Sequence, residues 1–159
     1  MRIIKLFLLI TLVFTITDSF AQCNNSLIDS CRAKLGETIY LKHFKLRFAK
    51  AKKRGNPSMA NFSVYLNKGT DYTFTIANDK TLKGEAIVKL YDDFRFFGSN
   101  EKKKSKDLAP AFKFLCSKTG IYYITIQYKD GEAGCSVVML SMKPKKKKYD
   151  WDKMEKKAE

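Results

Sequence analysis

The chain is 159 residues long and strongly basic, with 31 lysine and arginine residues against 16 aspartate and glutamate residues and a formal net charge of +15. Hydrophobic residues make up 45% and charged residues 30% of the sequence, which excludes an acidic disordered chain and a protein that spans a membrane many times. The length fits one folded domain. One histidine and four cysteines make most metal centres and catalytic triads improbable.

Residues 1–21 have the pattern of a secretory signal peptide. A basic start precedes an apolar run over residues 6–16, and Ser19 and Ala21 supply the small side chains that signal peptidase requires. The apolar run is about half the ~20 residues that a membrane-spanning helix needs, although an uncleaved anchor helix stays an alternative. We predict cleavage between Ala21 and Gln22, and a mature protein without a transmembrane span that is secreted or lies in the periplasm or at the outer cell surface.

The predicted export determines how the four cysteines are interpreted. In an exported protein an even number of cysteines indicates disulfides before metal ligands or nucleophiles. No CxxC pair is present, which disfavours a zinc site and a redox motif. The predicted disulfide cysteines are Cys23, Cys31, Cys116 and Cys135.

One short helix is predicted near the start of the mature chain. Within residues 25–35, Leu27, Ile28, Cys31 and Leu35 recur at helical spacing, and Gly36 follows where a helix would end. From about residue 39 the apolar period changes from helical spacing to two, the period of strands.

The rest of the chain to residue 142 predicts about seven or eight short strands. Turn sequences separate the apolar alternations, among them Lys68-Gly69-Thr70 and the hairpin signal Asp130-Gly131. No long helical pattern interrupts them, so a parallel α/β sheet is excluded. The alternating positions are Phe44, Leu46, Phe48; Phe62, Val64, Leu66; Tyr72, Phe74, Ile76; Ala86, Val88, Leu90; Phe112, Phe114, Cys116; Tyr122, Ile124, Ile126, Tyr128; and Cys135, Val137, Met139, Ser141.

The predicted fold class is therefore all-β, an antiparallel sandwich of jelly-roll-like or immunoglobulin-like type with a short N-terminal helix. The predicted organisation is a signal peptide over 1–21, a disulfide-stapled domain over 22–142 and a lysine-rich, flexible tail over 143–159. If segments 111–117, 120–129 and 134–142 form a meander, Cys116 and Cys135 lie more than about 20 Å apart. This disfavours pairing neighbouring cysteines and predicts two long-range bridges from the helix to the last strands, with their connectivity open.

Two stretches resemble known protein families. Residues 66–74 read Leu-x-x-Gly-Thr-x-Tyr-x-Phe, and residues 119–123 read Thr-Gly-x-Tyr-Tyr. They resemble small, uncharacterised secreted β-sandwich proteins of Gram-negative bacteria and, more loosely, bacterial pre-peptidase C-terminal domains. The resemblance spans about residues 36–142 and implies a jelly-roll-like sandwich and an accessory role. It implies no catalytic or binding residue.

Candidate catalytic and metal-binding residues are few. His43 is the one histidine, no GxSxG, HExxH or GxxxxGK motif is present, and His43 is predicted to be a half-buried or surface residue. Asp92-Asp93 is the most conspicuous carboxylate pair, and a turn or strand end explains it better than acid–base chemistry. We predict no enzyme activity, no cofactor and no metal site.

Lysine-rich segments are the most functional-looking feature. If they converge, they form a candidate site for an anionic polysaccharide or lipopolysaccharide; extracellular DNA is a further polyanion, but no motif predicts specific nucleic-acid binding. The alternative is that they only solvate the protein. The candidate residues are Lys50, Lys52, Lys53, Arg54, Lys102, Lys103, Lys104, Lys106, Lys145, Lys146, Lys147 and Lys148.

Exposed aromatic residues offer a second candidate surface. Tyr40, Tyr65, Tyr91 and Tyr123 fall on the face of their strands opposite the predicted core, where they either form a sugar-binding platform or pack across strands. Trp151 lies in the predicted tail. The leading functional hypothesis is an exported, non-enzymatic accessory or binding module that contacts anionic glycan or cell-surface polymer. The alternative is a structural or protein-partner-binding subunit whose charge is incidental.

Overall fold

The structure is a computed structural model that describes residues 23–52, 57–102, 105 and 107–144. The predicted signal peptide and most of the predicted tail lie outside these residues. Within them, no helix is both long and apolar enough to cross a membrane. The elements in chain order are helix α2 (Ser26–Arg32), strands β1 (Ile39–Phe48), β2 (Met59–Leu66), β3 (Asp71–Asn78), β4 (Ala86–Tyr91), β5 (Phe96–Ser99), β6 (Ala111–Leu115) and β7 (Gly120–Tyr128), a single 3-10 turn (Lys129–Gly131), and β8 (Gly134–Met142).

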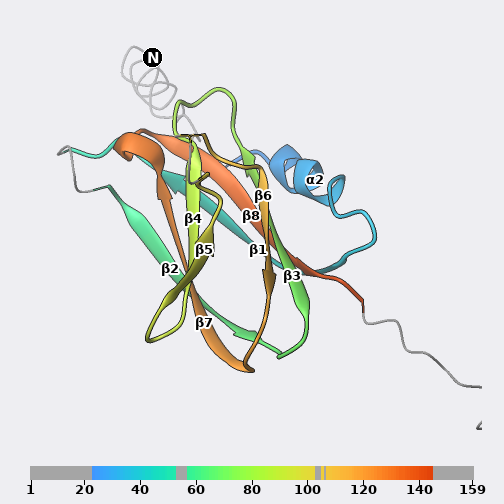
Figure 1. The fold of residues 1–159 in the computed structure, drawn as a ribbon. Helices are drawn as coiled ribbons and strands as arrows, with labels where there is room; N and C mark the ends of the chain where they lie inside the picture. Colours follow the sequence, from blue (N-terminus) through green and yellow to red (C-terminus); the bar gives the residue numbers. More distant parts are fainter. Residues whose placement is uncertain (1–22, 53–56, 103–104, 106, 145–159) are drawn as a thin grey trace, which may run out of the picture.

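Two four-stranded antiparallel sheets pack face to face (Figure 1). We call the sheet with strand order β1-β8-β3-β6 sheet A and the sheet with order β2-β7-β4-β5 sheet B. The described strands therefore confirm the predicted all-β, antiparallel sandwich with one short N-terminal helix.

The main core lies between the sheets and follows from the period-two pattern of the strands. Alternate side chains of a strand point to one face, so the apolar positions of each strand meet those of the facing sheet. Phe74, Leu90, Ile124 and Ile126 are completely buried there. Phe44 of β1 contacts Phe62 of β2 with 4.6 Å between ring centroids, which places these two edge strands opposite each other.

Helix α2 covers the outer face of sheet A (Figure 1). The helical spacing of Leu27 and Cys31 turns both side chains onto Val137 and Met139 of β8, and the four form a second buried cluster with Cys23, Ala77 and Cys135. The helix ends at Arg32, before Gly36, whose positive φ of 55° belongs to the turn that leads into β1.

One long-range disulfide joins the N-terminal segment to β8. Cys23 and Cys135 are bonded, which confirms one of the two predicted bridges. The second bridge is a wrong prediction, because Cys31 and Cys116 are free, buried thiols. Cys31 belongs to α2 and packs against the outer face of sheet A, whereas Cys116 lies in the core between the sheets. Sheet A therefore stands between the two sulfur atoms.

The predicted meander of the last three strands is also wrong. Strands β6 and β8 both pair with β3 in sheet A, whereas β7 lies in sheet B between β2 and β4. Asp130 and Gly131 do form a turn with positive φ values of 54° and 66°. This turn connects strands of different sheets, so it does not close a hairpin.

Strand β5 was not predicted from the sequence. It has four residues and pairs with β4 through an irregular register. Beyond it, the buried Asn100 continues the pairing with its side chain: its Oδ1 accepts from the Val88 amide at 2.8 Å, and its Nδ2 donates to the carbonyl of Ala86 at 2.9 Å and that of Ala109 at 3.2 Å. A side-chain amide thus extends the edge of sheet B.

Candidate functional site

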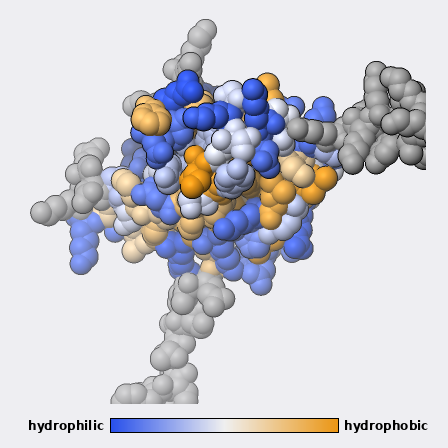
Figure 2. Space-filling model, turned by 90° about the horizontal axis from the view of Figure 1, so that it is seen from below, coloured by the Kyte–Doolittle hydropathy of each residue, from blue (hydrophilic) through white to orange (hydrophobic). Residues whose placement is uncertain are grey.

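Three turns gather at the lower end of the sandwich in Figure 1 and form what we call the turn end. They are the β2–β3 turn (67–70), the β4–β5 hairpin (92–95) and the β6–β7 turn (116–119). The amide of Lys68 donates to Thr119 Oγ1 at 2.8 Å, and the amide of Gly69 donates to the carbonyl of Cys116 at 2.7 Å. Two of the turns are therefore bonded into one unit. Figure 2 looks onto this end and shows apolar patches among hydrophilic residues.

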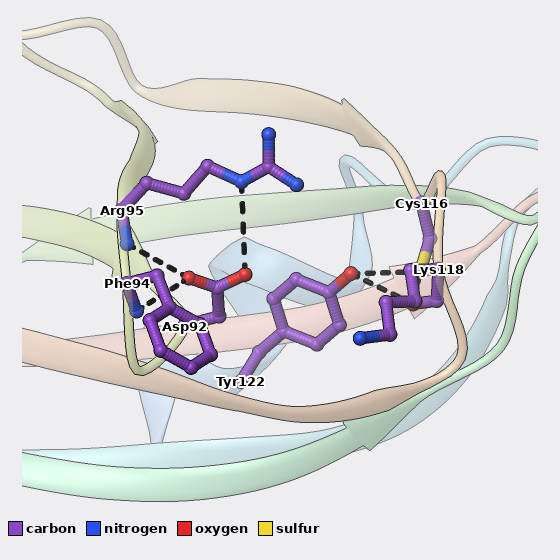
Figure 3. A network of polar contacts seen from close by, with 6 residues as sticks. All are labelled: Asp92, Phe94, Arg95, Cys116, Lys118 and Tyr122. Carbon is purple, nitrogen blue, oxygen red and sulfur yellow. Dashed lines mark hydrogen bonds and ion pairs between the residues drawn. The ribbon is translucent and has the colours of Figure 1, made fainter.

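The β4–β5 hairpin carries a solvent-exposed phenylalanine at its tip. Asp92 Oδ1 accepts hydrogen bonds from the amides of Phe94 at 2.9 Å and Arg95 at 2.8 Å, and the Asp92 amide donates to the Arg95 carbonyl at 3.0 Å (Figure 3). The Arg95 side chain adds an ion pair, with its Nε 3.8 Å from Asp92 Oδ2. These contacts fix the loop backbone, and Phe94 at its tip is 92% exposed.

The electrostatics of Asp92 match this structural role. The amide of Phe94, followed by that of Arg95 and the Arg95 guanidinium, lowers the pKa of the Asp92 carboxyl below its ordinary value. Hydrogen bonds to the charged form of a carboxylate stabilise that form. Asp92 is thus an ionised loop-fixing residue at neutral pH, and its pKa is shifted away from that of a general acid.

A pocket of about 280 Å³ opens between the hairpin and the β6–β7 turn. Its floor is Tyr122, whose hydroxyl donates to the carbonyl of Lys118 at 2.7 Å and lies 3.6 Å from Cys116 Sγ (Figure 3). Burial, with the Cys116 contact, raises the pKa of Tyr122 to about 12, so the hydroxyl remains a donor. The lining residues are Asp92, Asp93, Phe94, Lys118, Thr119, Gly120, Ile121 and Tyr122.

A row of exposed apolar side chains continues from this pocket over the outer face of sheet B. Tyr65 pairs with Ile121, and Tyr91 pairs with both Tyr123 and Phe96. Since paired residues point to the same face, these five side chains, which we call the aromatic face, are neighbours. Tyr65 is 66% exposed, Ile121 56% and Phe96 53%, and the rings of Tyr91 and Phe96 lie 5.2 Å apart.

Two carboxylates beside the aromatic face form hydrogen bonds within the protein. Asp93 accepts a hydrogen bond from the Tyr123 hydroxyl, and this bond raises the pKa of Tyr123. The carboxylate of Asp92 is held by the hairpin itself. Both carboxylates beside the aromatic face therefore already have partners within the protein.

The sequence located part of this face. Tyr65, Tyr91 and Tyr123 share the outer face of sheet B, as their strand positions predict, whereas Tyr40 lies on β1 of sheet A, where its hydroxyl is 2.8 Å from His43 Nδ1. The prediction of Asp92-Asp93 as a turn is confirmed, and so is the half-buried position of His43. Phe94 and Phe96 were not predicted as site residues; the available signal was a phenylalanine two residues after a turn aspartate.

The structure describes only some of the predicted polyanion-binding residues. Of the twelve, the structure describes Lys50, Lys52 and Lys102, and Lys50 Nζ is paired with Glu132 at 2.8 Å. These three lie at the end of the sandwich opposite the turn end, whereas β8 runs toward the turn end before the tail begins. Lys53, Arg54, Lys103, Lys104, Lys106 and Lys145 to Lys148 lie outside the described residues.

No three histidine, cysteine, aspartate or glutamate side chains of the described segments come together as metal ligands. No protein-family model and no curated protein matches the chain. Among solved structures, the chain is similar to PliG of Aeromonas hydrophila, a periplasmic lysozyme inhibitor of g-type lysozyme, with 13% identity and a TM-score of 0.47 over 64% of this chain and 84% of that one.

Proposed function

We propose that this chain is an exported, non-enzymatic binding module that contacts a protein partner through Phe94 and the aromatic face. The observation that carries the proposal is Phe94, a large apolar side chain 92% exposed on a hairpin whose backbone is already fixed. A loop whose backbone is already ordered loses less conformational entropy on binding than a flexible loop.

The composition of the surface supports a protein partner over a glycan. Contiguous exposed apolar patches mark interaction sites, and interface hot spots are rich in tyrosine and arginine. A sugar needs hydrogen-bond partners as well as rings, and the carboxylates of Asp92 and Asp93 are engaged within the protein. Export is supported by the signal-like residues 1–21 and by the Cys23–Cys135 disulfide, which suits an oxidising compartment.

The test is site-specific photo-crosslinking in the producing cells. A photoreactive phenylalanine analogue replaces Phe94 in one variant and Tyr40 in a matched control, because Tyr40 is 40% exposed on β1 of sheet A, away from the aromatic face. We expect a discrete protein adduct from position 94 that position 40 does not give. The same adducts at both positions, or no adduct at either, would contradict the proposal.

Anionic glycan binding through the lysine-rich segments is the second candidate. The net charge of +15 favours it. Elution from immobilised heparin in a salt gradient tests it: the triple variant Lys52→Ala, Lys102→Ala, Lys145→Ala should then elute at lower salt, and Phe94→Ala should elute unchanged. Absence of retention at low salt eliminates this candidate.

A further inference from the structure

The four sheet edges differ in how they resist pairing with another strand. An edge strand presents unpaired amides and carbonyls, and proteins protect such edges with charged residues, bulges, proline or very short strands. Strand β1 carries Lys42, Lys45 and Arg47 and an irregular register after Tyr40. Two further edges are protected because their strands are short: β5 has four residues, and β6 has five residues centred on Lys113.

Strand β2 has none of these protections. Its eight residues, Met59–Leu66, pair with β7 in a continuous register and contain no charged residue, glycine or proline. Among the described residues, β7 is its only strand partner, and β2 lies at the outer margin of sheet B (Figure 1). The core-facing Ala60 and Phe62 are half-buried and not fully buried, as expected beside an open edge.

The charged residues of the chain segment that forms this side of the sandwich have one sign. Between Glu37 and Asp71 the sequence contains no aspartate or glutamate, and this stretch includes both β1 and β2. Lys42 Nζ lies 5.3 Å from the ring centroid of Phe44, and that ring contacts Phe62 of β2. An ammonium group therefore lies beside the open edge, and Lys68 lies two residues after the end of β2.

We infer that β2 is the docking edge for an acidic polypeptide segment of another protein, which adds to sheet B as a fifth strand. Main-chain hydrogen bonds to β2 supply the attachment, and the carboxylates of the segment meet the basic side chains of Lys42 and Lys68. A second copy of this chain fits this edge poorly, because each copy brings a net charge of +15. The backbone edge of β2 does not include Phe94, and Tyr65 is its one residue in the aromatic face, so loss of the Phe94 contact and loss of strand addition are measured separately.

The experiment uses a synthetic, fluorescently labelled eight-residue peptide of alternating glutamate and valine. The full mature chain is added, and the anisotropy of the peptide measures its binding. Two further peptides carry N-methyl groups on the odd-numbered or on the even-numbered amides. Because alternate amides of a strand face one neighbour, one methylated peptide should lose roughly tenfold or more in affinity while the other binds like the parent. Equal binding of all three peptides at low salt would mean charge attraction alone and would overturn the inference.

Charge variants complete the test. Lys42→Glu should weaken binding of the parent peptide by roughly tenfold, whereas the matched control Lys113→Glu on the opposite edge should leave it unchanged. Equal effects of the two variants would show a general charge effect and contradict the assignment to β2. Sedimentation of the chain alone as a dimer that Ser63→Glu dissociates would assign the edge to a second copy and would likewise overturn it.

Discussion

Single polar side chains complete the backbone pairing of this sandwich where its strands end. Asn100 is 2% exposed and bonds three main-chain groups from β4 and from the segment before β6. Asp92 does the same for the β4–β5 hairpin at the surface. Both are short side chains that imitate backbone amides or carbonyls, which is why they occupy these positions.

Replacement of Asn100 tests this role. Asn100→Ala leaves the Val88 amide and two carbonyls without their partner in a buried place, and we expect a loss of roughly 2–3 kcal/mol in the free energy of unfolding. Urea denaturation measures it. Asn61→Ala is the matched control, because Asn61 is exposed and bonds Thr125 Oγ1. A loss at position 100 no larger than that at position 61 would contradict the role.

Tyr128 predicts how stability depends on alkaline pH. Its hydroxyl donates to the carbonyl of Leu46 at 2.9 Å and lies 3.0 Å from Ser136 Oγ, and burial raises its pKa from 10 to about 12. The folded state thus binds more protons than the unfolded state between these values. Stability is complete below pH 10 and should fall as the pH rises from 10 to 12.

The measurement compares urea denaturation at pH 8 and pH 11. Tyr128→Phe should be less stable than the parent at pH 8, because the Leu46 carbonyl loses its donor, and should lose less stability on going to pH 11. The raised pKa of Tyr122 leaves part of the alkaline loss in place. An unchanged pH dependence in the variant would show that Tyr128 does not titrate as described.

At the scale of elements, the N-terminal segment is attached to the sandwich by both packing and a covalent bond. Helix α2 buries Leu27 and Cys31 on β8, and the Cys23–Cys135 disulfide closes a sequence separation of 112 residues. Such a bond restricts the unfolded chain strongly. The double substitution Cys23→Ser with Cys135→Ser should therefore lower the free energy of unfolding by roughly 2–4 kcal/mol.

Peptide mapping under non-reducing conditions checks the pairing itself. We expect one disulfide-linked peptide pair, Cys23 with Cys135, and two thiols that react with iodoacetamide only after denaturation, because Cys31 is 0% and Cys116 1% exposed. A peptide that joins Cys31 to Cys116 would contradict the fold, because sheet A separates these residues.

The sequence predicted the elements better than their arrangement. Apolar alternation located seven of the eight described strands, because every second residue of each strand faces the core between the sheets. The four residues of β5 are too few to show a period. The sheet to which β7 belongs was not predictable, since the Asp130-Gly131 turn has the residues of a hairpin but joins two sheets. The prediction of a second disulfide was wrong because local spacing does not reveal which side of a sheet a cysteine faces.

The candidate site shows the same limit. The outward positions of Tyr65, Tyr91 and Tyr123 follow from strand alternation. Their neighbourhood depends on β2, β7 and β4 being adjacent, which is a property of the topology. The exposure of Phe94 depends on the hydrogen bonds of Asp92 within the hairpin. These hydrogen bonds cannot be read from the order of apolar and polar residues.

For the molecule as a whole, distinct surfaces are separated by the two-layer architecture. The aromatic face and Phe94 lie on sheet B at the turn end, the open edge of β2 flanks the same sheet, and α2 covers the outer face of sheet A (Figure 1). The described residues of the lysine-rich loops lie at the opposite end. We therefore propose the apolar surface of sheet B as the main contact and give the charge a secondary role.

The most direct measurement of this assignment is the affinity of the protein partner, once it has been identified by crosslinking at position 94, for three purified forms of the chain. These are the parent, Phe94→Ala and the double variant Lys52→Ala with Lys102→Ala. We predict that Phe94→Ala weakens the complex by roughly 30-fold, as loss of a hot-spot side chain does, and that the lysine variant stays within about twofold of the parent. A lysine variant that loses the complex while Phe94→Ala retains it would contradict the account.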